Sequence, residues 1–389
     1  MFVLHIPSWY PDDSKPFTGN FIERHIEAIA LKIPSVTLKV VETNQRTVTR
    51  TVEEVSPNNT VCTYYVTRKR SLLGRLFNKF LFGYYYIRGG QFIEQQFGKP
   101  SLLHLHVAFP RGSVAVQFKK KWKVPLLLTE HWSGYHARNY PSLPLKVRKE
   151  LHKTWAHIDG ITTVSEYLLN EIQERFPVSQ SAIIYNVVDH NLFQPQPVSF
   201  PPIKLIHIST LDEDAKNFQG ILEAVLEIRK KRNDFVLNVV SEFVKPQYEQ
   251  WVVDHQLSDT VYFLGSKSSE EVAELLAQHH FLILYSNYEN QPCVISEAFS
   301  CGKPVLSSDV GGIPEIISPD RGVIIAPQKT ELLIAALEQF MDNFNRYNAE
   351  NIREYAINHF SKEVIAEKFW QFYQKFTIFS QRDKKCRTQ

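Results

Sequence analysis

The sequence lacks the features of several large protein classes. No apolar run is long enough to span a membrane. Phe2 to Ile6 is too short for the apolar core of a signal peptide and has no basic flank, so we expect no such peptide. No G-x-G-x-x-G fingerprint occurs, which argues against a nicotinamide-dependent enzyme. The cysteines show no metal-ligand spacing and predict reduced thiols in a cytoplasmic protein: Cys62, Cys293, Cys301 and Cys386.

What is present fits a globular protein of two domains. The chain has 389 residues, with 43% hydrophobic and 22% charged residues, so long disorder is not expected. Residues 1–195 carry 24 basic against 15 acidic residues, whereas residues 196–389 carry 20 against 26. This contrast suggests different partners for the two halves, with a membrane or an anionic acceptor facing the positive one.

Apolar strands alternate with helical stretches twice along the chain, which predicts an α/β protein with two parallel sheets covered on both faces. We expect one domain over residues 1–190 and another over residues 203–361, joined by the proline-rich linker Asp189 to Pro202. An aromatic helix within residues 362–380 packs either back on the first domain or on its own domain. Asn20 and Glu23 have the spacing of a capping box for the helix Phe21 to Leu31.

Two glutamates stand eight positions apart near residue 290. Glu289 lies on a loop after the predicted strand Phe281 to Tyr285, and Glu297 lies in the predicted helix Cys293 to Ser300, with Pro292 at its first position. A helix N-terminus at such a junction can hold a diphosphate, because its first N–H groups lack partners within the helix. Taken alone, both glutamates also suit the ordinary preference for acids near a helix start.

The sequence around the two glutamates resembles that of a known family. The glutamate pair, the turn Cys301-Gly302-Lys303, the strand Pro304 to Ser307 and the segment Val310 to Glu315 are similar to the E-x7-E region of family 4 retaining glycosyltransferases. The similarity covers most of the chain and is densest from Lys204 to Pro327. It implies the GT-B fold, in which two doubly wound Rossmann-like domains face each other across a cleft, with ligands at the carboxyl ends of the strands.

The resemblance also implies roles for single residues. Lys216 would neutralise the donor diphosphate, Glu297 would bind the ribose, and Glu289 would position the sugar. His131, at the end of a strand, would bond a sugar hydroxyl; a lone histidine is otherwise commonly structural. The catalytic set is therefore Glu289, His131 and Lys216, and the donor-binding set is Gly19, Thr210, Lys216, Gly265, Asn290, Gln291, Pro292, Cys293, Val294 and Glu297.

The sequence departs from the family pattern at two places. After the first strand of the second domain, Ser209 and Thr210 replace a common Gly-Arg pair. Near the N-terminus, the segment Phe17 to Asn20 resembles a glycine loop of the family, and Asn20 replaces its second glycine. Asp212 and Asp214 imitate an Asp-x-Asp metal site, but that motif belongs to a different fold, so we expect no metal and no other cofactor.

Residues 55–93 contain no acid and mix basic with apolar residues. Leu73, Leu76, Phe77 and Phe80 recur at helical spacing, which predicts a basic amphipathic helix that attaches residues 68–88 to an anionic membrane surface. A core helix with a solvated basic face is the alternative. No nucleic-acid-binding module is recognisable.

The sequence therefore predicts a metal-independent hexosyltransferase of the cytoplasm, peripheral on the inner face of the plasma membrane. It would move a sugar with retention from a nucleotide-diphosphate sugar to a glycan or lipid-linked acceptor in cell-surface polysaccharide synthesis. A nucleotide-sugar 2-epimerase and an inactive scaffold of the same fold are the alternatives.

Overall fold

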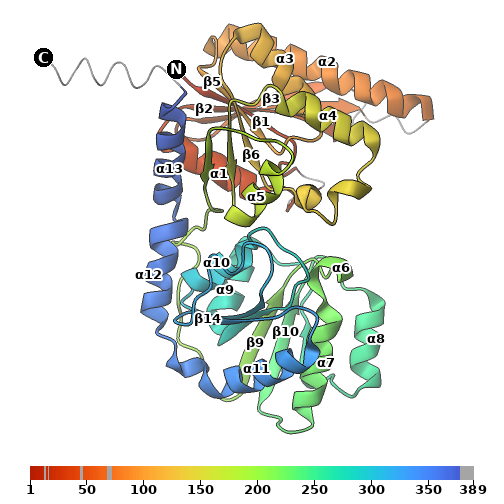
Figure 1. Ribbon diagram of the computed structural model, residues 1–389, viewed down its shortest axis with the longest axis vertical. Helices are drawn as coiled ribbons and strands as arrows, with labels where there is room; N and C mark the ends of the chain where they lie inside the picture. Colours follow the sequence, from red (N-terminus) through yellow and green to blue (C-terminus); the bar gives the residue numbers. More distant parts are fainter. Residues whose placement is uncertain (13–14, 16, 44–46, 68–71, 377–389) are drawn as a thin grey trace, which may run out of the picture. The chain divides into compact units, whose positions relative to one another are not determined.

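The computed structural model describes residues 1–12, 15, 17–43, 47–67 and 72–376, and for residues 72–77 and 79 the backbone alone. The chain divides into two compact units. Unit 1 comprises Met1–Val187 and the chain from Lys362 onward, and unit 2 comprises Val188–Ser361. Each is built around its own sheet and core, as Figure 1 shows. No helix in the described residues is long and apolar enough to cross a bilayer.

Unit 1 holds an eight-stranded sheet in the order β3-β4-β2-β1-β5-β6-β7-β8. The strands are β1 (Val3–Pro7), β2 (Ser35–Thr43), β3 (Thr49–Ser56), β4 (Asn59–Thr67), β5 (Leu102–His106), β6 (Leu126–Glu130), β7 (Gly160–Thr163) and β8 (Ser181–Ile183). All neighbours pair in parallel except β3, which is antiparallel to β4. Every residue of β1, β5 and β6 is buried, as expected where helices cover both faces.

The helices of unit 1 are α1 (Asn20–Ala30), α2 (Leu72–Phe97), α3 (Gly112–Trp122), α4 (Leu145–Trp155), α5 (Glu166–Gln173) and α13 (Lys362–Gln374), with short 3₁₀ turns η1 (Ser133–Tyr135) and η2 (Tyr140–Ser142). α13 is the last helix of the described residues, yet it packs beside α1 in unit 1 (Figure 1) and buries Phe369 and Phe372 against the sheet. The ion pair between Lys362 and Glu27, at 2.9 Å, joins the two helices.

Unit 2 holds a parallel six-stranded sheet in the order β11-β10-β9-β12-β13-β14. Its strands are β9 (Ile203–Ile208), β10 (Phe235–Val240), β11 (Val261–Phe263), β12 (Phe281–Leu284), β13 (Val305–Ser308) and β14 (Gly322–Ile325). Its helices are α6 (Glu213–Lys216), α7 (Phe218–Arg229), α8 (Pro246–Asp254), α9 (Ser269–Gln278), α10 (Cys293–Ser300), α11 (Thr330–Asn343) and α12 (Ala349–Phe360), with η3 (Phe344–Arg346) between the last two.

Local sequence explains where several of these helices begin. Ser268 and Glu271 form a reciprocal capping box at the start of α9. The carboxylate of Asp212 accepts a hydrogen bond from the N–H of Ala215 at the start of α6. The capping box expected at Asn20 is wrong. Gly19 is the N-cap of α1, with φ 75°, and no side chain caps this helix.

Candidate active site

The predicted site residues Lys216 and Glu289 of unit 2 lie where the strand order of its sheet reverses. Strands β10 and β11 extend the sheet on one side of β9, and β12, β13 and β14 extend it on the other. The loops after β9 and β12 therefore leave the same edge of the sheet and diverge, which is the topological switch point where doubly wound sheets bind ligands. Lys216 lies beyond β9 and Glu289 beyond β12.

Lys216 and Glu289 form an ion pair although 73 positions separate them. The Lys216 ammonium donates to Oε1 of Glu289, and the Ser286 hydroxyl donates to the same oxygen at 2.8 Å. The side chains are 19% and 10% exposed, so water screens the pair weakly. The two residues to which the family resemblance assigned phosphate and sugar roles are thus in direct contact.

Backbone contacts fix the loop that carries Glu289. The Asn287 N–H donates to the carbonyl of Ala215 at 2.7 Å, and the Asn287 side-chain amide donates to the carbonyl of Asp214 at 3.0 Å. The two switch-point loops are therefore tied together beside the ion pair. In this arrangement Asp212 caps α6 and Asp214 contributes its carbonyl.

Gly311 supports the same loop from the other side. Its φ is 57°, and a Cβ built there would lie 1.8 Å from the carbonyl oxygen of Glu289, so only glycine fits. The N–H of Gly312 donates to the carbonyl of Asn290 at 2.9 Å. The glycine segment after β13 thus shapes the backbone on both sides of Glu289.

Helix α10 opens beside this loop, and its bounds agree with the predicted Cys293 to Ser300. Pro292 stands one position earlier than expected, as the N-cap, with φ −69° and ψ 118°. The N–H groups of Cys293 and Val294 belong to the first turn and have no i−4 carbonyl inside the helix. Glu297 lies one turn later and is 8% exposed.

The remaining predicted donor residues of unit 2 differ in their surroundings. Thr210 is exposed at the end of β9, whereas Gln291 is buried and Asn290 half-buried beside Glu289. Gly265 follows β11 with φ 71°, and a side chain there would meet no atom within 4 Å. Gly265 is therefore needed for its backbone conformation rather than for a close packing contact.

In unit 1, His131 directly follows β6, and its ring lies 4.6 Å from that of Phe21 in α1. The preceding Glu130 carboxylate accepts backbone N–H groups from Ala108 at 3.0 Å, from His131 at 2.9 Å and from Trp132 at 3.0 Å. Burial nevertheless raises the pKa of Glu130 to about 7. This glutamate holds the turn that presents His131, a role that the sequence analysis did not assign to it.

Gly19 was predicted to let a ligand approach the backbone closely. In the structure, the backbone of Trp9 occupies the space beside it. A Cβ there would lie 2.7 Å from the backbone carbon and oxygen of Trp9. The loop after β1 is thereby held against the start of α1. Gly19 and His131 belong to neighbouring parts of unit 1, because Phe21 contacts His131 two residues after Gly19.

A histidine cluster packs against Phe369 and Tyr373 of α13, and its members are His5, His25, His104, His106 and His131. Nδ1 of His5 is 3.1 Å from Nε2 of His106. His104 bonds the Tyr373 hydroxyl and the Thr129 hydroxyl, both at 2.6 Å. Burial lowers the pKa of all five imidazoles, that of His5 to about 3 and that of His25 to about 4.

His5, His104 and His106 also have nitrogen atoms within 4.8 Å of one another, and they are the one group in the described part of the chain with the spacing of metal ligands. Both His104 nitrogens already bond hydroxyl groups inside the core. The arrangement therefore fits a hydrogen-bonded core network better than a metal centre.

The architecture of two doubly wound α/β units is that of the GT-B glycosyltransferases. Comparison with known families agrees. The family of glycosyl transferases group 1 matches residues 191–359, and glycosyltransferase family 4 matches residues 40–192. The chain belongs to the family 4, group 1 glycosyltransferases with the GT-B fold.

Individual relatives are distant. An MMP alpha-(1->4)-mannosyltransferase of Mycolicibacterium hassiacum is 27% identical over 72% of this chain, which spans just under two thirds (66%) of that relative's length. TuaC of Bacillus subtilis, whose name places it in teichuronic acid biosynthesis, is 21% identical over 87% of this chain and 89% of its own. The Anabaena protein HepE, solved with UDP-glucose, has a TM-score of 0.71 at 16% identity and covers 96% of this chain and 100% of its own.

Proposed function

We propose that this protein is a retaining glycosyltransferase. It moves a sugar from a nucleotide-diphosphate sugar to a glycan or lipid-linked acceptor in cell-surface polysaccharide synthesis at the cytoplasmic side of the membrane. Family membership supports glycosyl transfer, the UDP-glucose complex of HepE supports a nucleotide-sugar donor, and the teichuronic acid assignment of TuaC supports the polysaccharide product.

One observation carries the proposal. Lys216 and Glu289 are paired at the switch point of unit 2, next to the first turn of α10. A fixed cation and a helix N-terminus are what a diphosphate requires, and a neighbouring carboxylate suits sugar hydroxyl groups. In the enzyme, Lys216 and the N–H groups of Cys293 and Val294 bind the diphosphate and stabilise the charge that develops as it leaves.

The other residues position the reactants. Glu297 accepts hydrogen bonds from the ribose, Glu289 orients the sugar, and the His131 imidazole bonds a sugar hydroxyl. Burial lowers the pKa of His131, so its ring is neutral near pH 7 and retains both a donor and an acceptor nitrogen. The acceptor hydroxyl attacks the sugar from the face that the diphosphate leaves, and the leaving diphosphate takes the proton of that hydroxyl. Attack on this face retains the anomeric configuration.

A thermal-shift panel of UDP, GDP, ADP and CMP sugars tests the donor class. We expect one nucleotide group to raise the melting temperature and its sugar to be transferred, with the anomeric configuration retained in the NMR spectrum of the product. Conversion of the donor sugar to its 2-epimer without an acceptor would instead assign the epimerase. If no nucleotide sugar shifts the melting temperature, and if the wild type shows no donor hydrolysis that depends on Glu289, as tested with Glu289→Ala, the protein would be the inactive scaffold.

We further propose that residues 68–88 attach the protein to anionic membrane. Residues 68–71 and the side chains of 72–77 and 79 lie outside the described residues; within the described part, Phe80 is 69% exposed on α2. Each basic residue near an anionic surface contributes about 1 kcal/mol. Charge reversal at Arg70, Arg75 and Lys79 should abolish sedimentation with phosphatidylglycerol vesicles and leave donor binding intact. Wild-type protein that ignores such vesicles at low salt would refute the attachment.

A further inference from the structure

Unit 1 contains a pocket of about 480 Å³ at the switch point of its own sheet. The pocket is lined by residues that follow β1, by the end of β2 and by Arg111 after β5. β1 lies between β2 and β5, so these segments leave the carboxyl edge of the sheet where its order reverses. The volume is in the range of small-molecule sites, and the aromatic side chains of Trp9, Tyr10, Phe82 and Tyr86 contribute to its wall.

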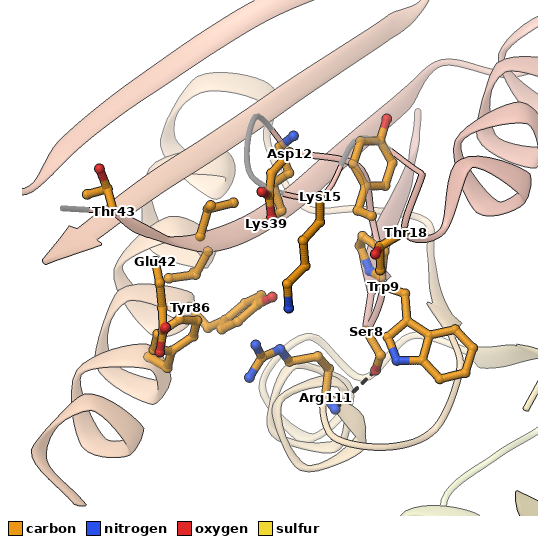
Figure 2. A pocket seen from close by; sticks show the side chains of 15 residues that line it. Ser8, Trp9, Asp12, Lys15, Thr18, Lys39, Glu42, Thr43, Tyr86 and Arg111 are labelled. Carbon is orange, nitrogen blue, oxygen red and sulfur yellow. Dashed lines mark hydrogen bonds between the residues drawn. The ribbon is translucent and has the colours of Figure 1, made fainter. Parts of the chain in front are cut away.

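Two cations face each other in this pocket. Figure 2 shows the side chains of Lys15 and Arg111 pointing toward one another across it, with the phenol of Tyr86 beside them. No hydrogen bond or ion pair joins either cationic group to another side chain of the described residues. Like charges that face one another without an anion repel, so this arrangement is stabilised when an anion lies between them.

Arg111 is held in place for such a contact. Its guanidinium lies 5.0 Å from the ring centroid of Phe82 and 5.2 Å from that of Tyr86, and its backbone N–H donates to the Ser8 hydroxyl at 3.2 Å. The Nε atom is buried and has no hydrogen-bond partner. A guanidinium fixed on aromatic faces with unused donors is suited to bind the two oxygens of a carboxylate or phosphate.

The other charged groups of the lining are already engaged. The Lys39 ammonium donates to the carbonyl of Pro11 at 3.0 Å and lies 4.7 Å from the ring centroid of Tyr10. Asp12 and Glu42 each make an interaction of their own. Lys15 and Arg111 are therefore the cations of this pocket that are available to a ligand.

We propose that this pocket binds an oxyanion, a phosphate or a carboxylate, on the sugar acceptor, and that Lys15 and Arg111 select acceptors by that charge. The inference rests on the proposed transferase function, because it names the acceptor class of that enzyme. The charge pair selects an anionic sugar over its neutral counterpart, since a neutral sugar leaves the two cations unneutralised.

Isothermal titration with three soluble probes tests the pocket without relying on transfer. The probes are glucose 6-phosphate, glucuronate and neutral glucose, and the proteins are wild type, Lys15→Ala/Arg111→Gln and the control Lys99→Ala. Lys99 is an exposed cation of unit 1 outside the pocket. We expect wild type and the control to bind at least one anionic probe about tenfold or more tightly than glucose, and the double variant to lose that preference.

The same samples are titrated with the nucleotide that the thermal-shift panel selects. Unchanged nucleotide binding by the double variant shows that it is folded and that its loss is confined to the pocket. Anion binding that is equal in wild type and double variant, or no anion binding by wild type, overturns the inference. A failure of the proposed function would appear differently, as the absence of nucleotide binding in every sample, wild type included.

Discussion

Unit 1 should lose stability as the pH falls below about 6.5, because five buried histidines form its core network. Burial lowers the pKa of all five, to about 3 for His5 and about 4 for His25, whereas a histidine in the unfolded chain titrates near 6.5. Below pH 6.5 the unfolded chain therefore binds protons that the folded chain does not. The free energy of unfolding must then fall from pH 6.5 down to the folded pKa values.

The size of the effect follows from these values. At pH 5.5 a histidine whose pKa in the folded state is about 4 or lower decreases the free energy of unfolding by about 1.4 kcal/mol, so His5 and His25 together decrease it by about 3 kcal/mol. Burial of His104, His106 and His131 acts in the same direction. Glu130 acts in the opposite direction, because burial raises its pKa to about 7 and the folded state gains a proton first. Glu130 therefore raises the free energy of unfolding by about 2 kcal/mol at pH 5.5. His5 and His25 thus outweigh Glu130 by about 1 kcal/mol, and the other three histidines increase the net loss of stability.

Urea unfolding at pH 8.0 and pH 5.5, followed by tryptophan fluorescence, measures this loss; Trp122 and Trp155 report on unit 1, where both are buried. His5→Asn should shrink the difference between the two pH values by about 1.4 kcal/mol, whatever it does to stability at pH 8.0. His255→Gln, at an exposed position in unit 2, should leave the difference unchanged. Equal free energies of unfolding at the two pH values in wild type would refute the reasoning.

Three further predictions concern the site in unit 2. Lys216→Ala should weaken donor binding at least tenfold, since a charge-assisted hydrogen bond contributes about 1.5–3 kcal/mol, and Lys216→Arg should recover part of it; unchanged donor titrations would remove this lysine from the site. Glu297→Gln should lower nucleotide affinity, whereas Glu289→Gln should lower turnover without weakening nucleotide binding, and an equal loss of nucleotide binding in both would show the roles to be misassigned. Activity should survive EDTA, and a loss that Mn²⁺ restores would return Asp212 and Asp214 to consideration as ligands.

The fold was largely accessible from the sequence where strands are apolar and buried. In the second half, the predicted strands Phe281 to Tyr285 and Pro304 to Ser307 agree with β12 and β13 within one residue, and the predicted helix Cys293 to Ser300 has the bounds of α10. The hairpin of β3 and β4 was missed. β3 is mostly exposed at the edge of the sheet, so its residues carry no apolar signal, and its place depends on pairing with β4.

The places of the candidate site residues in the fold could be predicted from the sequence, but their contacts could not. Sequence spacing located Lys216 and Glu289 at strand ends, yet their pairing depends on β9 and β12 being neighbours, which spacing does not specify. The same holds for Gly311, whose constraint is a tertiary contact with the Glu289 backbone. The sequence did not predict that Lys15 and Arg111 line one pocket, because these residues are 96 positions apart and only the adjacency of β1 and β5 brings them together.

The pairing of Lys216 with Glu289 has a consequence for the order of events in the proposed reaction. A diphosphate that takes a hydrogen bond from the Lys216 ammonium competes with the carboxylate, which keeps the Ser286 hydroxyl as a partner. The loop contacts through Asn287 and Gly311 do not depend on the lysine, so Glu289 stays in position when the ion pair loosens. Donor binding would then open one acceptor position on Oε1 of Glu289, beside the Ser286 hydroxyl, for a sugar hydroxyl, and the site would become competent to orient the sugar only once the diphosphate is bound.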